Sequence, residues 1–319
     1  MTEADRPSAT SASKITGTPN LRSIVYLFMG GVLFGLFFSL MRMATTEGVP
    51  FLAFVFWFAF GGAMLTLSYT FLRGKPPKWT RRHVRSYLAI ASTWLLAPFT
   101  VWAFVAPKLP AGITGLSISL APPLTLLFAL VLKIERFNLW RLAGMLLAAA
   151  GILLIVIPES SLPAREMAPW VLLTLAAPII GAIGNIWVAT LWPPGSTSEQ
   201  FAAGGLIVGS LLLLPVAVGA HGLWLFDGPF GNGHIALLGS MVIIAILWCL
   251  AMEIVRLSGS VFMSLFDYAG TLAGVGWGML IFGERHSLWI WAAILLLLTG
   301  IYFVNKTSKA VRKASASSH

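Results

Sequence analysis

The segments Glu135–Ile152 (ERFNLWRLAGMLLAAAGI) and Glu284–Ile301 (ERHSLWIWAAILLLLTGI) are two copies of one motif, placed 149 residues apart. Nine of their 18 positions are identical, including the run Glu-Arg-x-x-Leu-Trp. Chance matching between leucine-rich helices does not explain that run. The same offset brings Gly35 onto Gly184. The chain is therefore predicted to consist of two related halves.

The composition around this repeat is that of an integral membrane protein. Of the 319 residues, 58% are hydrophobic and 10% are charged, whereas a soluble domain has about 45–50% apolar and about 25% charged residues. The net charge of +10 does not indicate a nucleic-acid partner, because the basic residues lie in short segments between long apolar runs. The single cysteine, Cys249, excludes a disulfide framework and a cysteine-based metal site.

Ten apolar runs, each of at least 17 residues, predict ten transmembrane helices, since about 17–25 residues cross a hydrocarbon core of about 30 Å. Strands of a transmembrane barrel are shorter and alternate in polarity, so the fold is predicted to be all-α. Asp267 is the one charged residue within these runs. The runs are Ser23–Met41, Gly48–Leu72, Ser86–Pro107, Leu109–Leu132, Leu142–Pro158, Met167–Ser198, Gln200–Phe226, Gly228–Met252, Leu257–Gly283 and His286–Asn305.

The distribution of Lys and Arg predicts that both termini are cytoplasmic. With the N-terminus inside, 17 of the 21 basic residues lie on the cytoplasmic side, and the outer side keeps only Arg42, Lys108, Arg165 and Arg285. Each copy then holds five spans, an odd number, so the two copies enter the membrane from opposite sides. Inverted repeats of this kind are typical of secondary transporters, with the substrate site near mid-membrane between the halves. A duplicated scaffold without transport activity is the alternative.

The predicted organisation has four parts. Residues 1–20 form a disordered cytoplasmic tail, 21–158 the first five-helix repeat, 167–305 the second, inverted repeat, and 306–319 a basic cytoplasmic tail.

The segment Leu120–Thr125 (LAPPLT), followed by Glu135-Arg136, resembles the EamA family of the drug/metabolite transporter superfamily. Further matching positions are Gly35, Arg42, Gly144, Gly151, Phe282-Gly283-Glu284-Arg285 and Gly300. The resemblance covers about Leu21 to Asn305. It implies ten helices in two inverted bundles, export or exchange of small metabolites, and an inner or plasma membrane location. Trp57 departs from the family pattern, as does Thr271, which takes the place of Pro122 in the second copy.

The pair Pro122-Pro123 predicts a kinked or broken fourth span, because proline removes a backbone donor and clashes with the preceding turn. Pro98 and Pro178 predict the same in the third and sixth spans. The freed carbonyls must face protein or a cavity. These helices are expected either to wall a central cavity or simply to bend in order to pack.

Five residues are candidates for contact with the substrate. Asp267 lies about nine residues into the ninth span, about 14 Å deep at about 1.5 Å per residue. It is expected to bind a cationic or amino group or to carry a coupling proton, with a structural hydrogen bond or ion pair to a polar side chain of another span as the alternative. Tyr268 could present a hydroxyl beside it. Trp102 and Trp248 are expected to face a shared chamber, rather than lipid, and Asn185 to make either an interhelical hydrogen bond or a substrate contact.

Other polar and small residues have simpler interpretations. Gly270, Gly274 and Gly278 lie on one helix face, which favours tight packing over sliding. Arg42 is expected to snorkel at a span end, and Glu253 to pair with Arg256 three residues on. The two Glu-Arg pairs of the repeat are interpreted as helix-end caps or salt-bridged gates.

Together these features predict a secondary transporter, acting as an exporter of small organic metabolites such as amino acids or drugs by alternating access. A flippase for a lipid-linked substrate is the second interpretation. An intramembrane enzyme is a remote third, because the five histidines lie at loops, span ends or the C-terminus. No cofactor or nucleotide is expected, since a phosphate-binding glycine-rich loop with lysine is absent from the sequence.

Overall fold

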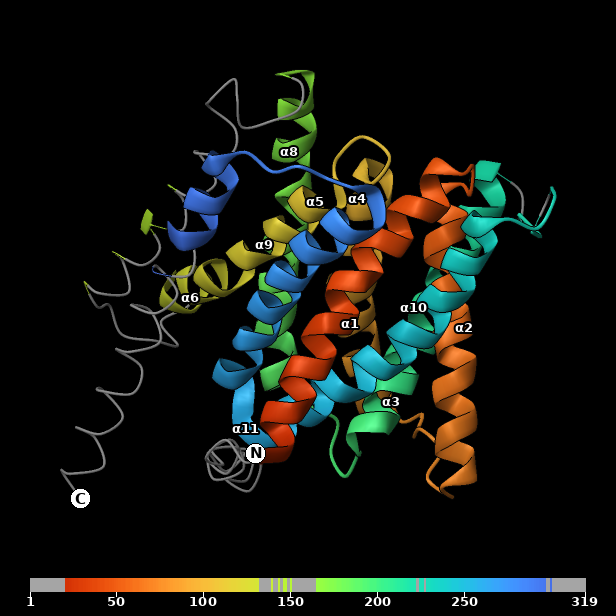
Figure 1. The fold of residues 1–319 in the computed structure, drawn as a ribbon. Coiled ribbons are helices and arrows are strands. Elements are labelled where there is room, and N and C mark those ends of the chain that lie inside the picture. The colour runs from red at the N-terminus through yellow and green to blue at the C-terminus, as the bar shows by residue number, and fades with distance from the viewer. Residues whose placement is uncertain are drawn as a thin grey trace.

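The computed structural model describes residues 21–131, 165–221, 224–226 and 228–296, together with positions 139, 143, 146, 147, 150 and 299. These residues form a bundle of helices and contain no strand (Figure 1). The α-helices are α1 (Leu21–Thr46), α2 (Phe51–Leu72), α3 (Arg81–Ile90), α4 (Ala97–Val105), α5 (Ala111–Ser117), α6 (Ala121–Val131), α8 (Ala168–Thr174), α9 (Ala176–Thr190), α10 (Ser198–His221) and α11 (Asn232–Phe282).

Within the described residues, six helical stretches are long and apolar enough to cross a membrane, which supports a multi-pass protein. They are Leu21–Thr46, Phe51–Leu72, Arg81–Val105, Ala168–Val188, Ser198–Ala220 and Asn232–Leu257. Most of the predicted fifth span, the end of the tenth and both tails lie outside the described residues. The ten-helix inverted repeat and its orientation stay predictions.

Prolines interrupt three of the predicted spans, as the sequence indicates. The third span changes from α3 to a π-helical segment, η3 (Ala91–Leu96), before α4, in which Pro98 offers no N–H to the carbonyl four residues earlier. The sixth span is divided at Leu175 into α8 and α9, three residues before Pro178. The fourth span is divided into α5 and α6 by a single 3₁₀ turn, η4 (Ile118–Leu120).

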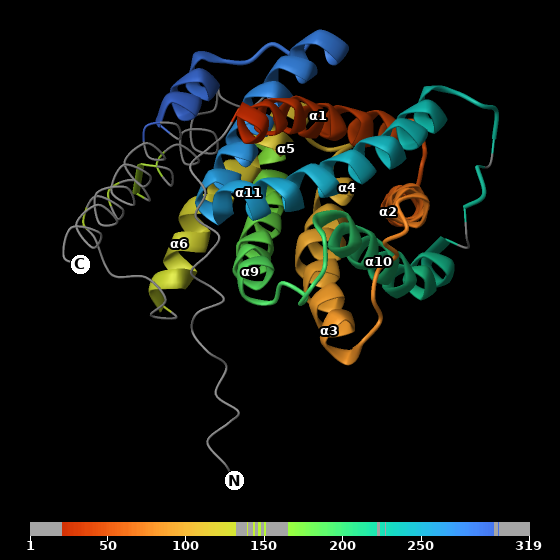
Figure 2. The ribbon, with the colours of Figure 1, turned by 90° about the horizontal axis from the view of Figure 1, so that it is seen from below.

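Helix α11 contains 51 residues, which would measure about 77 Å if the helix were straight. Its contacts with α1 show that it reverses direction. Facing pairs are Gly233 and Glu47, Gly239 and Leu40, Gly31 and Ala269, and Gly35 and Gly274. The first two pairs run antiparallel to α1 and the last two run parallel, so the turn lies between Gly239 and Ala269, and Figures 1 and 2 both show α1 beside α11. The first and second parts of α11 therefore correspond to the predicted eighth and ninth spans.

Glycines bring α1 and the second part of α11 into backbone contact. A Cβ atom added to Gly35 would lie 2.4 Å from the backbone nitrogen of Gly274, and one added to Gly270 would lie 2.7 Å from the ring of Phe34. Small residues allow this approach because lipid supplies no hydrophobic drive between helices. The prediction of tight packing at these glycines is confirmed.

Candidate functional site

The break in the fourth span is the centre of the candidate site. Pro122 has no N–H to offer to the carbonyl of Ile118, and the N–H of Ala121 bonds to that carbonyl instead. This exchange replaces an α-helical bond by a tighter 3₁₀ bond. A 3₁₀ turn thus directly precedes α6, in which Pro122-Pro123 predict a kink or a break, and the side chains of Ile118 and Ser119 in this turn are buried.

Helix α11 passes this break with its polar residues Asp267 and Thr271. The Thr271 hydroxyl lies 2.8 Å from the carbonyl oxygen of Asp267 and 3.4 Å from that of Gly115 in α5. Asp267 lies one helical turn before Thr271 and so shares its face. That face is turned towards α5 and η4, with which α11 is in contact.

The Asp267 carboxylate has no counter-ion within the described part of the chain. No donor or cation of those residues lies within hydrogen-bonding distance of it. Four described cations make polar contacts with other groups. Arg42 contacts Glu284, Arg256 contacts Glu253, Arg73 contacts the Tyr69 hydroxyl, and Lys78 contacts the carbonyl of Gly195. The alternative of a structural hydrogen bond or ion pair to another span therefore finds no support among the described residues.

Tyr268 is buried in a second hydrophobic cluster with Val105, Leu109 and Ile113. Leu120 of the break packs against the same cluster. Consecutive helical residues point in directions about 100° apart, which places Tyr268 and Asp267 on different faces. A Tyr268 hydroxyl beside the Asp267 carboxylate stays a prediction.

Trp102 reaches the break from α4. Its indole N–H donates a hydrogen bond of 3.2 Å to the hydroxyl of Ser117, which is the last residue of α5. The ring packs edge-on against Phe38, with centroids 5.2 Å apart, and against Phe99 at 5.3 Å. With 3% of its surface exposed, Trp102 is a packed residue that touches the candidate site through its polar edge.

Trp248 belongs to the same hydrophobic cluster as Trp102 but contacts other rings. It packs edge-on against Trp94 of η3, with centroids 6.2 Å apart, and only 4% of it is exposed. A chamber shared by Trp102 and Trp248 stays a prediction.

Asn185 of α9 uses both ends of its amide between helices. Its Oδ1 accepts the Trp94 indole N–H over 2.8 Å, and its Nδ2 donates to the Thr125 hydroxyl over 3.1 Å. The interhelical hydrogen bond expected from the sequence is therefore present. Sequence reasoning missed Trp94 and Thr125 as partners, although Thr125 ends the LAPPLT segment.

The site so assembled combines one carboxylate, hydroxyl groups and indole rings around a broken helix. Electron-rich ring faces and a carboxylate both attract positive charge. Groups of three or more His, Cys, Asp or Glu that would hold a metal ion do not occur among the described residues. The arrangement therefore suits an organic cation or an amine better than an anion.

Two ion pairs lie at the ends of the bundle. Glu253 pairs with Arg256, as predicted, and also accepts a hydrogen bond from Ser198 over 2.8 Å. The snorkelling interpretation of Arg42 is wrong, because its guanidinium pairs with Glu284, 242 residues away. The cap interpretation of Glu284 is confirmed, since its carboxylate accepts the N–H groups of Ala111 and Gly112 at the start of α5.

Comparisons with known proteins agree with this fold. The family profile described as the EamA-like transporter family matches residues 21–157. Among proteins with curated descriptions, none matches. Twenty-two chains of solved structures match. One, a crystal structure of a protein with 19% sequence identity, superposes with a TM-score of 0.59 over 89% of this chain and 96% of its own. At this identity the likeness shows a shared fold, and its coverage includes both halves of the chain.

Proposed function

Because residues 21–157 belong to the EamA-like transporter family, part of the drug/metabolite transporter superfamily, we propose that the chain is a secondary transporter of small organic metabolites. It acts as an exporter in the inner or plasma membrane. The observation that carries this proposal is the polar break of the fourth span, which lies against Asp267 and Thr271 of α11. The family is one of transporters, so no catalytic residue is assigned.

Alternating access follows from the proposed inverted halves. Two copies related by an axis in the membrane plane supply two access states by rocking about a site between them. Glycines allow the backbones of α1 and α11 to approach closely, and this contact supports movement of one helix against the other next to the proposed site. A broken helix is tolerated at membrane depth only where protein or a water-filled cavity receives its freed backbone groups.

Asp267 is the residue that recognises the substrate. Placing a charged Asp at the centre of a lone helix costs about 2.5–3.5 kcal/mol, so its presence needs a compensating partner. The described residues supply no such partner, and a cationic or amino group of the substrate would supply one. A coupling proton would neutralise the same carboxylate between substrates.

Trp102 and Trp248 contribute aromatic surface to the substrate site, and Asn185 positions Trp94 and the start of α6. The hydrogen bonds of Trp102 to Ser117 and of Asn185 to Thr125 support these roles, since both bonds end on the broken helix.

Uptake by purified protein in proteoliposomes tests the proposal. A panel of radiolabelled amines, amino acids, organic cations and organic anions is assayed with and without a pH gradient. We expect amines or cations to exchange faster than in empty liposomes, and anions to show no such increase. Rates equal to those of empty liposomes for the whole panel would contradict the proposal, and selective transport of anions would contradict the role of Asp267.

A further inference from the structure

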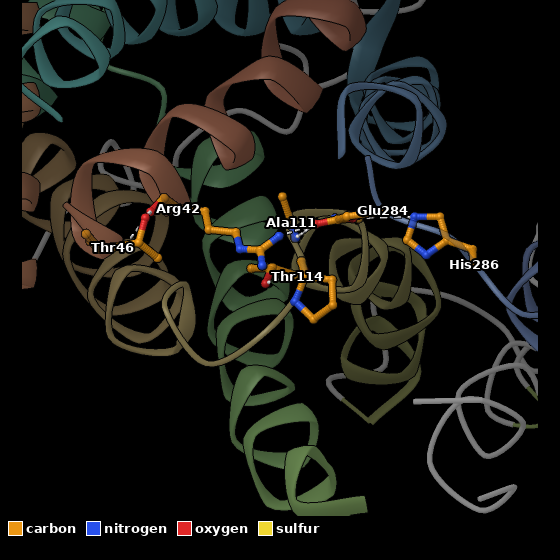
Figure 3. A network of polar contacts seen from close by, with 9 residues as sticks. Arg42, Thr46, Ala111, Thr114, Glu284 and His286 are labelled. Carbon is orange, nitrogen blue, oxygen red and sulfur yellow. Dashed lines mark hydrogen bonds and ion pairs between the residues drawn. The ribbon is translucent and has the colours of Figure 1, made fainter. Parts of the chain in front are cut away.

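A polar network joins the two halves at the end of the bundle where α1 finishes (Figure 3). Gly283, with φ 62°, ends α11 and turns the chain so that Glu284 points back across the bundle. The Glu284 carboxylate accepts the N–H of Ala111 over 2.7 Å and that of Gly112 over 3.2 Å, and it pairs with the Arg42 guanidinium. Three segments distant in sequence therefore meet at one carboxylate.

The surroundings of this carboxylate are largely closed to solvent. The Glu284 side chain is 8% exposed and that of Arg42 is 25% exposed. The guanidinium carbon of Arg42 lies 4.6 Å from the ring centre of Phe282. Hydrogen bonds to charged groups are stronger than those between neutral groups, and low exposure limits their screening by salt. The network is thus a strong local contact between the halves.

His286 completes the network on its far side. Its Nε2 lies 3.4 Å from a Glu284 oxygen, and the ring is buried. The Arg42 guanidinium contacts the same carboxylate and is the cation that balances Glu284.

Two glycines leave room for the carboxylate. A Cβ atom added to Gly278 would lie 2.3 Å from a Glu284 oxygen, and one added to Gly112 would lie 3.0 Å from the His286 ring. Side chains at these two positions would displace the network, so the backbone is shaped around it.

The equivalent positions in the sequence repeat keep the glutamate but not its arginine and histidine neighbours. At the offset of 149 residues Glu135 corresponds to Glu284, but Leu191 corresponds to Arg42 and Phe137 to His286. The sequence thus keeps the carboxylate in both copies and supplies the partner cation only for the outer one.

We propose that Arg42, Glu284 and the first turn of α5 form an outer latch, which holds the outer end of the transporter closed and breaks each time that end opens. Because the inner end has no equivalent cation, the resting protein keeps its outer end closed and its substrate site open to the cytoplasm. This order suits an exporter, which loads from inside. The inference rests on the proposed function, since a latch presupposes alternating access.

A single-cysteine reporter measures opening without any substrate. In a Cys249→Ser background, Thr114→Cys places the reporter in α5, at a position that is 1% exposed and lies near Arg42 in Figure 3. A membrane-impermeant maleimide is added from outside, and the labelling rate is compared with those of the Arg42→Gln and Glu284→Gln variants. Arg285→Gln, which alters the exposed neighbour of Glu284, is the matched control.

We expect labelling to become at least about tenfold faster in both latch variants, the factor that corresponds to losing one hydrogen bond to a charged group. The Arg285→Gln control should keep the parental rate. Arg42→Gln leaves Glu284 to cap α5, so it remains informative if Glu284→Gln does not fold, and size-exclusion profiles check folding of each variant. Unchanged labelling in Arg42→Gln, or an equal increase in Arg285→Gln, would overturn the latch. Labelling needs no transported compound, so a negative uptake panel leaves this result unaffected and bears only on the proposed function.

Discussion

The fourth and ninth spans hold equivalent places in the sequence repeat but differ in backbone structure. The fourth is divided by a 3₁₀ turn before Pro122, while the ninth continues as helix through Thr271, the equivalent residue. Ile118 in the turn corresponds to Asp267. The break and the Asp267 carboxylate thus occupy the same repeat position in opposite halves. The candidate site therefore includes positions at which the two copies of the repeat differ.

The largest expected effect comes from making the ninth span resemble the fourth. Thr271→Pro removes the N–H available to the Asp267 carbonyl and clashes with the preceding turn, at a cost of about 3 kcal/mol or more. We expect a clear loss of thermal stability in detergent, measured by tryptophan fluorescence, whereas Thr271→Val should lose less because it deletes only the hydroxyl. A Thr271→Pro variant as stable as its parent would show that the ninth span already bends at this position.

The next largest effect is expected at Asp267, a carboxylate whose counterpart in the first copy is Ile118. Asp267→Asn keeps the side-chain shape and removes the charge, so transport of cationic compounds should fall about 10–100-fold, as expected for a hydrogen bond between charged groups. Glu166→Gln, an acid-to-amide change in the turn η5 (Arg165–Met167), is the control and should transport normally. Uptake is normalised to the folded protein in each preparation. Wild-type rates in Asp267→Asn across the pH range would remove Asp267 from the site.

Local features of the sequence predicted several of these elements correctly. Pro98, Pro122 and Pro178 mark the interrupted spans because a missing N–H acts within one helical turn. The Glu253–Arg256 pair followed from its spacing of three residues. These effects depend only on neighbours along the chain.

Contacts between distant segments were not predictable in the same way. Arg42 and Glu284 are 242 residues apart, and Trp94 and Asn185 are 91 apart. Which face of one helix meets which face of another depends on packing, and hydropathy is uniform around helices in lipid. The sequence therefore indicated that Asn185 needs a partner without identifying Trp94.

A smaller effect is expected from giving the proposed inner end a cation at the position equivalent to Arg42. Leu191→Arg places a guanidinium at that position, and the proposed inverted repeat pairs it with Glu135, the counterpart of Glu284. A stabilised inner closure should shift the population towards outward opening and raise labelling of the Thr114→Cys reporter about twofold to fivefold, as expected for an exposed or partly exposed ion pair. Leu191→Gln, polar but uncharged, is the control. A decrease in labelling would contradict the proposed equivalence of the two ends.

The smallest effect concerns the sixth span and its counterpart, the first. Asn185 corresponds to Leu36, so Asn185→Leu makes the two spans alike at nearly constant volume. The change deletes the bonds to Trp94 and Thr125, although the Thr125 hydroxyl keeps its 2.7 Å bond to the carbonyl of Ala121. Polar bonds between transmembrane helices average about 0.6 kcal/mol, so we expect a slightly lower unfolding temperature and transport within about threefold of the parent. Both are measured on the same preparation. Loss of transport at unchanged stability would instead assign Asn185 to the substrate, because a purely interhelical bond affects transport only through the packing that it supports.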